Sequence, residues 1–201
     1  MKNIKLFSLL AAMLLVFASC EEVDEVPEFN NWQARNTQYI DSISDVARSG
    51  EGEWKVFLAT GLDESKEWDN QYYVYCNVIQ AGNGTESPTY TDTVSVNYKG
   101  RLIPSKTYPQ GYIFDSSYDG ELEPEFDVPV KLKLSGTVPG FSTALQHMVA
   151  GTTNSNGDIW RIYIPYALGY GANATSGIPA YSTLIFDVNL VSFVTTGTSN
   201  N

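Results

Sequence analysis

From residue 72 onward, apolar and polar side chains alternate in short runs. An alternation with a period of two residues is typical of β-strands that bury one face. The alternating runs cover residues 74–78, 94–98, 130–134, 162–164 and 184–190. A chain with so many strands and so few helical segments indicates a sheet protein.

Two segments show helical spacing instead. In residues 31–48 the apolar positions recur at mostly helical intervals, and Ser49 and Gly50 supply a stop signal. In residues 141–149 the apolar side chains form one stripe, as in a helix that seals one side of a sheet. We therefore predict an α+β fold: an antiparallel β-sheet half-barrel wrapped around one short α-helix, with a short N-terminal helical extension.

The start of the chain has the pattern of an export signal. Lys2 and Lys5 precede an apolar run that is shorter than the ~20 residues needed to cross a bilayer, and small residues follow it. The chain thus divides into a signal peptide, an acidic tether, an extension with a helix, the sheet domain and a disordered tail. These parts are residues 1–19, 20–30, 31–70, 71–194 and 195–201.

The apolar run closes on Phe17, Ala18, Ser19 and Cys20, which resembles a bacterial lipobox, although Leu is more common where Phe17 stands. Cys20 is then the predicted lipidation site, and the alternative is an ordinary signal peptide with an incidental cysteine. The acidic residues after Cys20 resemble the export tag of Bacteroidota-type surface lipoproteins, or form only a solvated tether. The expected location is a lipid anchor in the bacterial cell envelope, at the periplasmic or outer face of the outer membrane.

Composition narrows the possible functions. The 201 residues include 12 Lys and Arg against 23 Asp and Glu, a net charge of −11, which argues against nucleic acid as a partner. Loss of residues 1–19 with their two lysines changes this charge to −13. One His and two Cys leave little material for a metal site or a catalytic triad. We expect His147 to face solvent and Cys76 to be buried.

Residues 115–120 look like the start of a calcium loop, but Phe126 stands at the twelfth position, where a bidentate Glu is needed. Residues 82–84 follow a strand and open no helix, so they predict a turn and no phosphate site. We therefore predict no metal and no cofactor.

Six short segments, in a fixed order, carry a resemblance to a known family. The segment 114–117 reads F-D-S-S, and the segment 136–141 is similar to one that ends V-I-x-G-W. The others are residues 92–100, 144–151, 165–171 with 177–179, and 183–190. Together these segments resemble an FKBP-type peptidyl-prolyl cis–trans isomerase domain over residues 72–193. Its fold, an antiparallel sheet around one short helix, agrees with the pattern found above.

The resemblance implies a proline pocket that acts on proline-containing unfolded or exported polypeptides without a cofactor. The residues that match pocket positions are Tyr98, Phe114, Asp115, Val138, Phe141, Tyr170, Ile178 and Phe186. Phe141 would form the floor, the Val138 and Ile178 segments would offer backbone groups, and the Tyr170 hydroxyl would donate a hydrogen bond. Asp115 would either influence the substrate carbonyl or orient its neighbours.

The chain also departs from the family pattern. Phe141 replaces the usual Trp, Val130 stands where the family has an aromatic residue near the flap strand, and Pro139 occupies a position that is often polar. Residues 103–112, 118–128 and 152–158 look like longer loops or insertions. These differences leave two hypotheses: an isomerase that assists folding of exported proteins, and a catalytically weak peptide-binding or chaperone lipoprotein of the same fold. The oligomeric state stays open.

Overall fold

The structure, a computed structural model, describes residues 27–151 and 157–195. The predicted signal peptide, the predicted lipidation site Cys20 and most of the tether and tail lie outside the described residues. Within the described part of the chain, no helix has both the length and the apolar character needed to cross a membrane.

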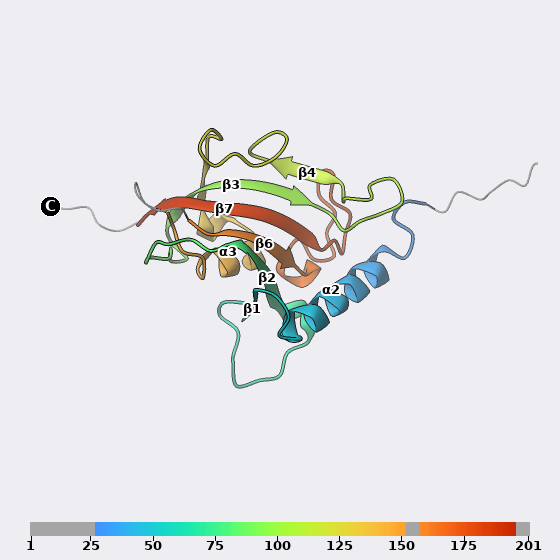
Figure 1. The fold of residues 1–201 in the computed structure, drawn as a ribbon. Helices are drawn as coiled ribbons and strands as arrows, with labels where there is room; N and C mark the ends of the chain where they lie inside the picture. The colour runs from blue at the N-terminus through green and yellow to red at the C-terminus, as the bar shows by residue number, and fades with distance from the viewer. Residues whose placement is uncertain (1–26, 152–156, 196–201) are drawn as a thin grey trace, which may run out of the picture. The chain divides into compact units, whose positions relative to one another are not determined.

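The described strands form one antiparallel sheet (Figure 1). Its order is β1-β2-β6-β7-β3-β4, and β5 pairs with β3 beside β4. The strands are β1 (Trp54–Leu58), β2 (Tyr73–Gln80), β3 (Thr93–Arg101), β4 (Ile113–Ser116), β5 (Val130–Lys133), β6 (Ile159–Ile164) and β7 (Leu184–Val194). Short 3-10 turns are η1 (Asn70–Tyr72), η2 (Leu134–Gly136) and η3 (Tyr166–Leu168).

The inner face of the sheet packs on helix α3 (Pro139–Leu145). Neighbouring residues on a strand point to opposite faces, so each strand sends alternate side chains to this core. Among them are Cys76 and Ile162, which are fully buried with Leu145 and Met148 of the α3 region. The curved sheet around one short helix confirms the predicted α+β half-barrel.

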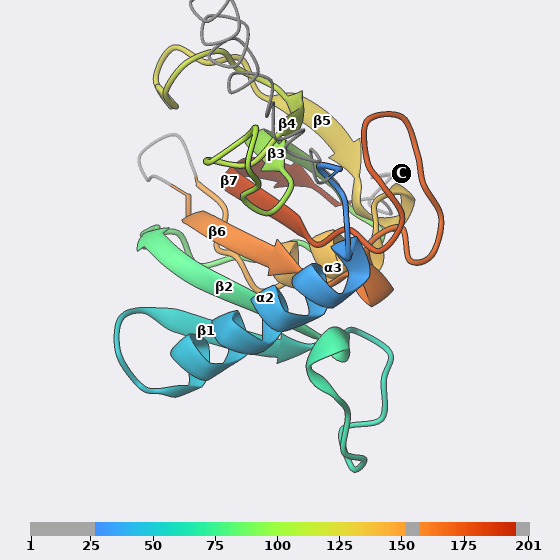
Figure 2. The ribbon, with the colours of Figure 1, turned by 90° about the vertical axis from the view of Figure 1, so that its right-hand side faces the viewer.

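The outer face of the sheet is partly covered by helix α2 (Trp32–Arg48), which contacts β1 and β2. Figure 2 shows α2 crossing these strands, with α3 behind the sheet. The ring of Tyr39 on α2 lies 6.3 Å from that of Tyr163 on β6, and the guanidinium of Arg48 lies over Tyr73. The predicted N-terminal helix is therefore confirmed, and it forms a second layer on the sheet.

The buried side of α2 differs from the predicted apolar stripe. The buried residues are Trp32, Asn36, Ile40 and Ser44, which recur every four positions, whereas Val46 is 49% exposed. Two of the four are polar, and both have hydrogen-bond partners elsewhere in the fold. Asn36 hydrogen-bonds to Thr183, and Ser44 to Asn70.

The second predicted helix has different ends. It was expected over residues 141–149, but α3 begins at Pro139 and ends at Leu145. Proline suits the first helical position because a backbone N–H there would have no acceptor within the helix, so its absence in proline costs nothing. After Leu145 the backbone tightens into turns, with hydrogen bonds from His147 N to Ala144 O and from Met148 N to Leu145 O. Met148 is nevertheless fully buried, as its place in the stripe predicts.

Strand β1 comes from the predicted extension but belongs to the main sheet. It pairs with β2 over its whole length, from Trp54 opposite Asn77 to Leu58 opposite Tyr73. The expected boundary at residue 71 therefore falls between two hydrogen-bonded strands. The extension contributes an edge strand as well as a covering helix.

Asp158 joins three segments near the start of β6. Its side chain is 4% exposed, and its two oxygens accept hydrogen bonds from Gly82 N and Val149 N, each at 2.7 Å. These bonds hold the end of β2 and the segment after α3 against β6. Without the carboxylate, two backbone donors would lose their partners.

We expect Asp158→Ala to lower the free energy of unfolding by about 2 kcal/mol or more, because unpaired buried polar groups cost about 1–3 kcal/mol each. Urea unfolding followed by circular dichroism measures this loss. Asp158→Asn, which keeps one acceptor oxygen, should lower the free energy of unfolding by a smaller amount. An alanine variant as stable as the parent would contradict the role given to this carboxylate.

Candidate functional site

The predicted pocket residues meet where β3 changes partners. On one side β3 pairs with β7 along its length, while on the other it pairs first with β5 and then with β4. Tyr98 lies between these two pairings, and its backbone N–H donates to Ser117 Oγ at 2.9 Å. At this gap between the β5 and β4 pairings, the side chain of Tyr98 lines a cavity on the inner face of the sheet, near the start of α3.

The ring of Phe186 on β7 lies at the centre of an aromatic cluster. Its centroid is 5.1 Å from that of Phe141, 5.5 Å from that of Phe114 and 6.1 Å from that of Tyr98, with steep angles between the rings. Such edge-to-face packing is the arrangement that aromatic rings prefer. The cluster therefore gives the site rigid, apolar walls.

The rings of Tyr98, Phe141 and Phe186 border a cavity of about 370 Å³. Its lining residues are Tyr98, Asp115, Leu132, Gly136, Thr137, Val138, Phe141, Tyr170 and Phe186. Six of the eight residues predicted from the sequence are in this set, although they come from β3, β4, β7, α3 and two loops. Phe141 is 4% exposed and Tyr170 is 43% exposed, so Phe141 lies deep in the site and Tyr170 at its surface.

Two predicted residues do not line the cavity. Phe114 packs edge-on against Phe186 and supports that wall from behind. Ile178 is 5% exposed and belongs to the core, and its backbone N–H donates to Thr175 O at 3.0 Å. Its carbonyl accepts from Thr175 N at 2.9 Å, so both backbone groups of Ile178 are already used within the loop.

Sequence reasoning missed Leu132, Gly136 and Thr137. Leu132 lines the cavity from β5, where the sequence comparison had singled out Val130. Both point to the same face, because they are two residues apart on one strand. The alternation of residues 130–134 was a usable signal, but it did not say which member reaches the cavity.

Tyr98 and Asp115 form a side-chain hydrogen bond within the cavity lining. The Tyr98 hydroxyl donates to Asp115 Oδ2 at 2.6 Å. Burial of the phenol, the hydrogen bond to Asp115 and the carboxylate's charge all raise the pKa of Tyr98. The phenol therefore stays protonated at neutral pH and remains a donor to Asp115. This contact corresponds to the neighbour-orienting role that the sequence analysis considered for Asp115.

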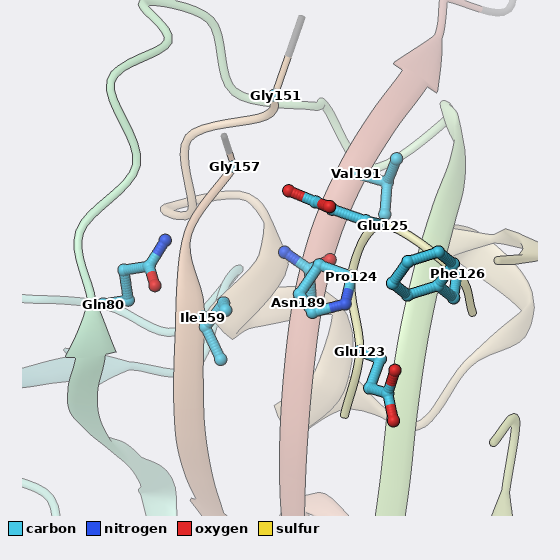
Figure 3. Close-up of a pocket in the computed structure, with 10 residues that line it drawn as sticks. All are labelled: Gln80, Glu123, Pro124, Glu125, Phe126, Gly151, Gly157, Ile159, Asn189 and Val191. Atoms are coloured by element: carbon cyan, nitrogen blue, oxygen red, sulfur yellow. The ribbon is translucent and has the colours of Figure 1, made fainter. Parts of the chain in front are cut away.

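A second cavity, of about 410 Å³, lies on the other face of the sheet (Figure 3). The segment 123–126, from one of the predicted insertions, lies over β7, and Asn189, Ile159 and Gln80 extend the lining across β7, β6 and β2. Its single aromatic residue, Phe126, is 77% exposed. This cavity has no enclosing aromatic walls and contains none of the predicted pocket residues.

The other candidate residues stay outside the site. His147 is exposed, as predicted, and stacks on Phe57 with 3.9 Å between the ring centroids. This stacking partly desolvates the ring and, together with nearby Lys55, lowers the pKa of His147. Cys76 is fully buried, as predicted, and burial raises the pKa of its thiol. Among the described residues, no group of three or more His, Cys, Asp or Glu could hold a metal ion.

A family-wide comparison matches residues 84–191, more than half of the chain, to the FKBP-type peptidyl-prolyl cis-trans isomerase family. The chain belongs to this family. The matched range contains every residue of the aromatic cavity. It begins after β2, so α2, β1 and β2 of this FKBP-type chain lie outside it.

Individual relatives agree with the family match. The peptidyl-prolyl cis-trans isomerase Mip of Coxiella burnetii is 40% identical over 116 residues, which are 57% of this chain and 42% of that protein. The outer membrane protein MIP of Legionella longbeachae is 32% identical over 166 residues, or 82% of this chain and 57% of that protein. This chain therefore spans about half the length of these relatives.

A solved structure shows the same fold. The crystal structure of FkpA from Escherichia coli superposes with a TM-score of 0.56 at 28% identity, over 82% of this chain and 62% of that one. Because 82% of this chain exceeds the family-matched range, the structural likeness includes residues beyond it.

Gly100 is a position where this FKBP-type site has no space for a side chain. A Cβ atom there would lie 2.6 Å from the Phe114 ring and 2.7 Å from the Phe186 ring. We expect Gly100→Ala to force these rings apart and to lower stability by about 1–3 kcal/mol, the usual cost of overpacking. Urea unfolding measures the loss.

Gly136 provides the matched control, because a Cβ there meets no atom within 4 Å although the residue lines the same cavity. Gly136→Ala should leave the unfolding midpoint almost unchanged. Equal effects of the two substitutions would show that ring contact at Gly100 is not the cause.

Proposed function

We propose that this chain is a peptidyl-prolyl cis–trans isomerase that assists the folding of exported polypeptides. The observation that carries the proposal is the aromatic cavity, in which Tyr98, Phe141 and Phe186 enclose an apolar space with one carboxylate. Membership of the isomerase family supports it. Uncatalysed X–Pro isomerisation takes tens to hundreds of seconds at 25 °C, slow enough to limit folding.

The chemistry of isomerisation suits such a site. Rotation about a peptide bond must overcome a barrier of about 18–20 kcal/mol that arises from C–N resonance. No bond to another group forms or breaks, so no nucleophile is needed. The planar amide is more polar than the twisted one, and a dry apolar wall therefore favours the twisted form relative to the planar ground states.

Individual residues have distinct roles in this proposal. Phe141 would form the floor under the proline ring, and the Tyr170 hydroxyl, at the surface, would donate a hydrogen bond to the substrate. The Val138 carbonyl accepts from Phe141 N and Ser142 N at the start of α3, so the Val138 N–H is the group expected to reach the substrate. Asp115, held by Tyr98, would orient that ring as the second wall.

We also propose that the protein is attached to the bacterial cell envelope through a lipid on Cys20. The sequence around Cys20 supports this, because a basic start, a short apolar run and a cysteine at the expected cleavage point occur together. A relative is named as an outer membrane protein, which agrees with an envelope location. The acidic tether after Cys20 would keep the isomerase domain away from the membrane surface.

Isomerisation of a short X-Pro-Phe peptide tests the proposed activity. The parent chain should accelerate the reaction, and Tyr170→Ala should lower kcat/KM roughly tenfold, because the variant loses an aromatic wall and a hydrogen bond. Tyr170 is 43% exposed, so its removal should leave the fold intact. Tyr90→Ala is the matched control, since Tyr90 is 49% exposed and does not line the cavity.

No acceleration by the folded parent chain would refute the enzyme proposal and leave a peptide-binding protein of the same fold. An equal fall of kcat/KM in the Tyr90 and Tyr170 variants would show that the aromatic cavity is not the site of the reaction.

Cys20→Ser tests the proposed anchor. The variant should move from the membrane fraction to the soluble fraction of the cell envelope, because its attachment depends on the lipid at this position. Cell fractionation with antibody detection measures the change. Full retention of the variant in the membrane fraction would overturn the lipid-anchor proposal.

A further inference from the structure

Tyr170 reaches the cavity from a long loop, residues 165–183, that we call the pocket loop. The part of this loop from Gly171 to Tyr181 is closed by a hydrogen bond, because Tyr181 N donates to Gly171 O at 2.8 Å. The rings of Tyr166 and Tyr181 also pack edge to face, 5.4 Å apart. The position of Tyr170 therefore depends on the backbone at Tyr181 and beyond.

Tyr181 itself has a strained backbone. Its φ angle is +60°, in the left-handed region that residues other than glycine seldom adopt. A conformation of this kind persists only where the surrounding structure holds it in place. Gly171 supplies one restraint, and the residues that follow Tyr181 must supply the rest.

Those restraints come from the first turns of α2. Trp32 Nε1 donates to Ser182 Oγ at 2.8 Å, and Ser182 Oγ donates in turn to Pro179 O at 2.7 Å. Thr183 N donates to Asn36 Oδ1 at 2.7 Å. The four residues that join α2 to this segment are buried: Asn36 and Thr183 are 0% exposed, Ser182 is 3% and Trp32 is 6%.

A second hydrogen bond fixes the orientation of the Asn36 side chain. Its Nδ2 donates to Trp32 O at 2.7 Å, one helical turn back, which aims the amide oxygen at Thr183. A fully buried polar side chain is costly unless it is hydrogen-bonded, so the bonds to Trp32 O and Thr183 N account for Asn at this position. The contacts join residues that are 147 and 150 positions apart in the sequence.

We propose that Trp32 and Asn36 are positioning residues for the proline pocket. They clamp the end of the pocket loop at Ser182 and Thr183, the loop closes through Tyr181 and Gly171, and Tyr170 is thereby held at the cavity. Helix α2 lies outside the family-matched residues 84–191, so a helix beyond this range would complete the site. The effect on catalysis rests on the isomerase proposed above, whereas the clamp itself does not.

The test compares Asn36→Leu and Trp32→Phe with the parent, as full chains. Asn36→Leu keeps the size of the side chain and removes the acceptor for Thr183 N, while Trp32→Phe keeps an aromatic ring and removes the donor to Ser182. For the X-Pro-Phe peptide, KM should rise roughly fivefold, the size expected from one lost buried hydrogen bond. The value of kcat should stay within about twofold, because Phe141 and Phe186 are unchanged.

Ser44→Ala is the matched control on the same helix. Ser44 is 2% exposed and its Oγ donates to Asn70 Oδ1 at 3.0 Å, so this substitution removes a partly buried hydrogen bond between α2 and the rest of the fold. Asn70 lies in η1, which contacts η3 near the start of the pocket loop but takes no part in the hydrogen bonds that hold Ser182 and Thr183. Ser44→Ala should also lower Tm, yet leave KM unchanged.

Amide hydrogen exchange provides a measurement that does not depend on catalysis. Peptides that cover residues 170–183 should exchange roughly tenfold faster in the Asn36 and Trp32 variants and at the parent rate in Ser44→Ala. Unchanged exchange and KM in the first two variants would overturn the clamp and leave α2 with a role in stability only. If the parent shows no isomerase activity, the proposed function fails, and the exchange rates still decide whether the clamp exists.

Discussion

The close packing of two aromatic rings against the backbone of Gly100 on β3 is the constraint on which the aromatic cavity depends. Because Gly100 has no side chain, the rings of Phe114 and Phe186 occupy the space beside its backbone. Phe186 then meets Phe141 and Tyr98, and the walls of the cavity follow. A similar approach occurs at Gly140, where a Cβ would lie 2.3 Å from Ile164 Cγ2, and it brings α3 and Phe141 against the sheet.

Much of this architecture could be predicted from the sequence. Strands that bury one face alternate in hydrophobicity, so the runs around Val94, Ile162 and Phe186 predicted the sheet correctly. The short motifs led to six residues that now line one cavity, although they are scattered over about 90 positions. Family resemblance could do this because it carries information about tertiary contacts, which periodicity alone does not.

The features that the sequence did not predict depend on contacts between residues far apart in the chain. Asn36 and Ser44 are polar, so a search for apolar stripes passed over them, and their partners Thr183 and Asn70 are unrecognisable from local sequence. Ile178 matched a pocket position, yet local hydrogen bonds with Thr175 turn its backbone to another use. The early end of α3 has the same origin: tertiary packing keeps Met148 buried after the helical hydrogen bonds have stopped.

The burial of Cys76 has a consequence for the compartment in which the protein would fold. This sequence contains two cysteines, Cys20 and Cys76, and Cys76 lies on β2 with no exposed surface. A thiol with its pKa raised by burial is a poor nucleophile and reacts slowly with oxidants. In the bacterial periplasm, where disulfides form readily, the folded domain would therefore keep the same covalent structure under reducing and oxidising conditions. If the protein is exported as proposed, its folding would not depend on forming a disulfide at Cys76.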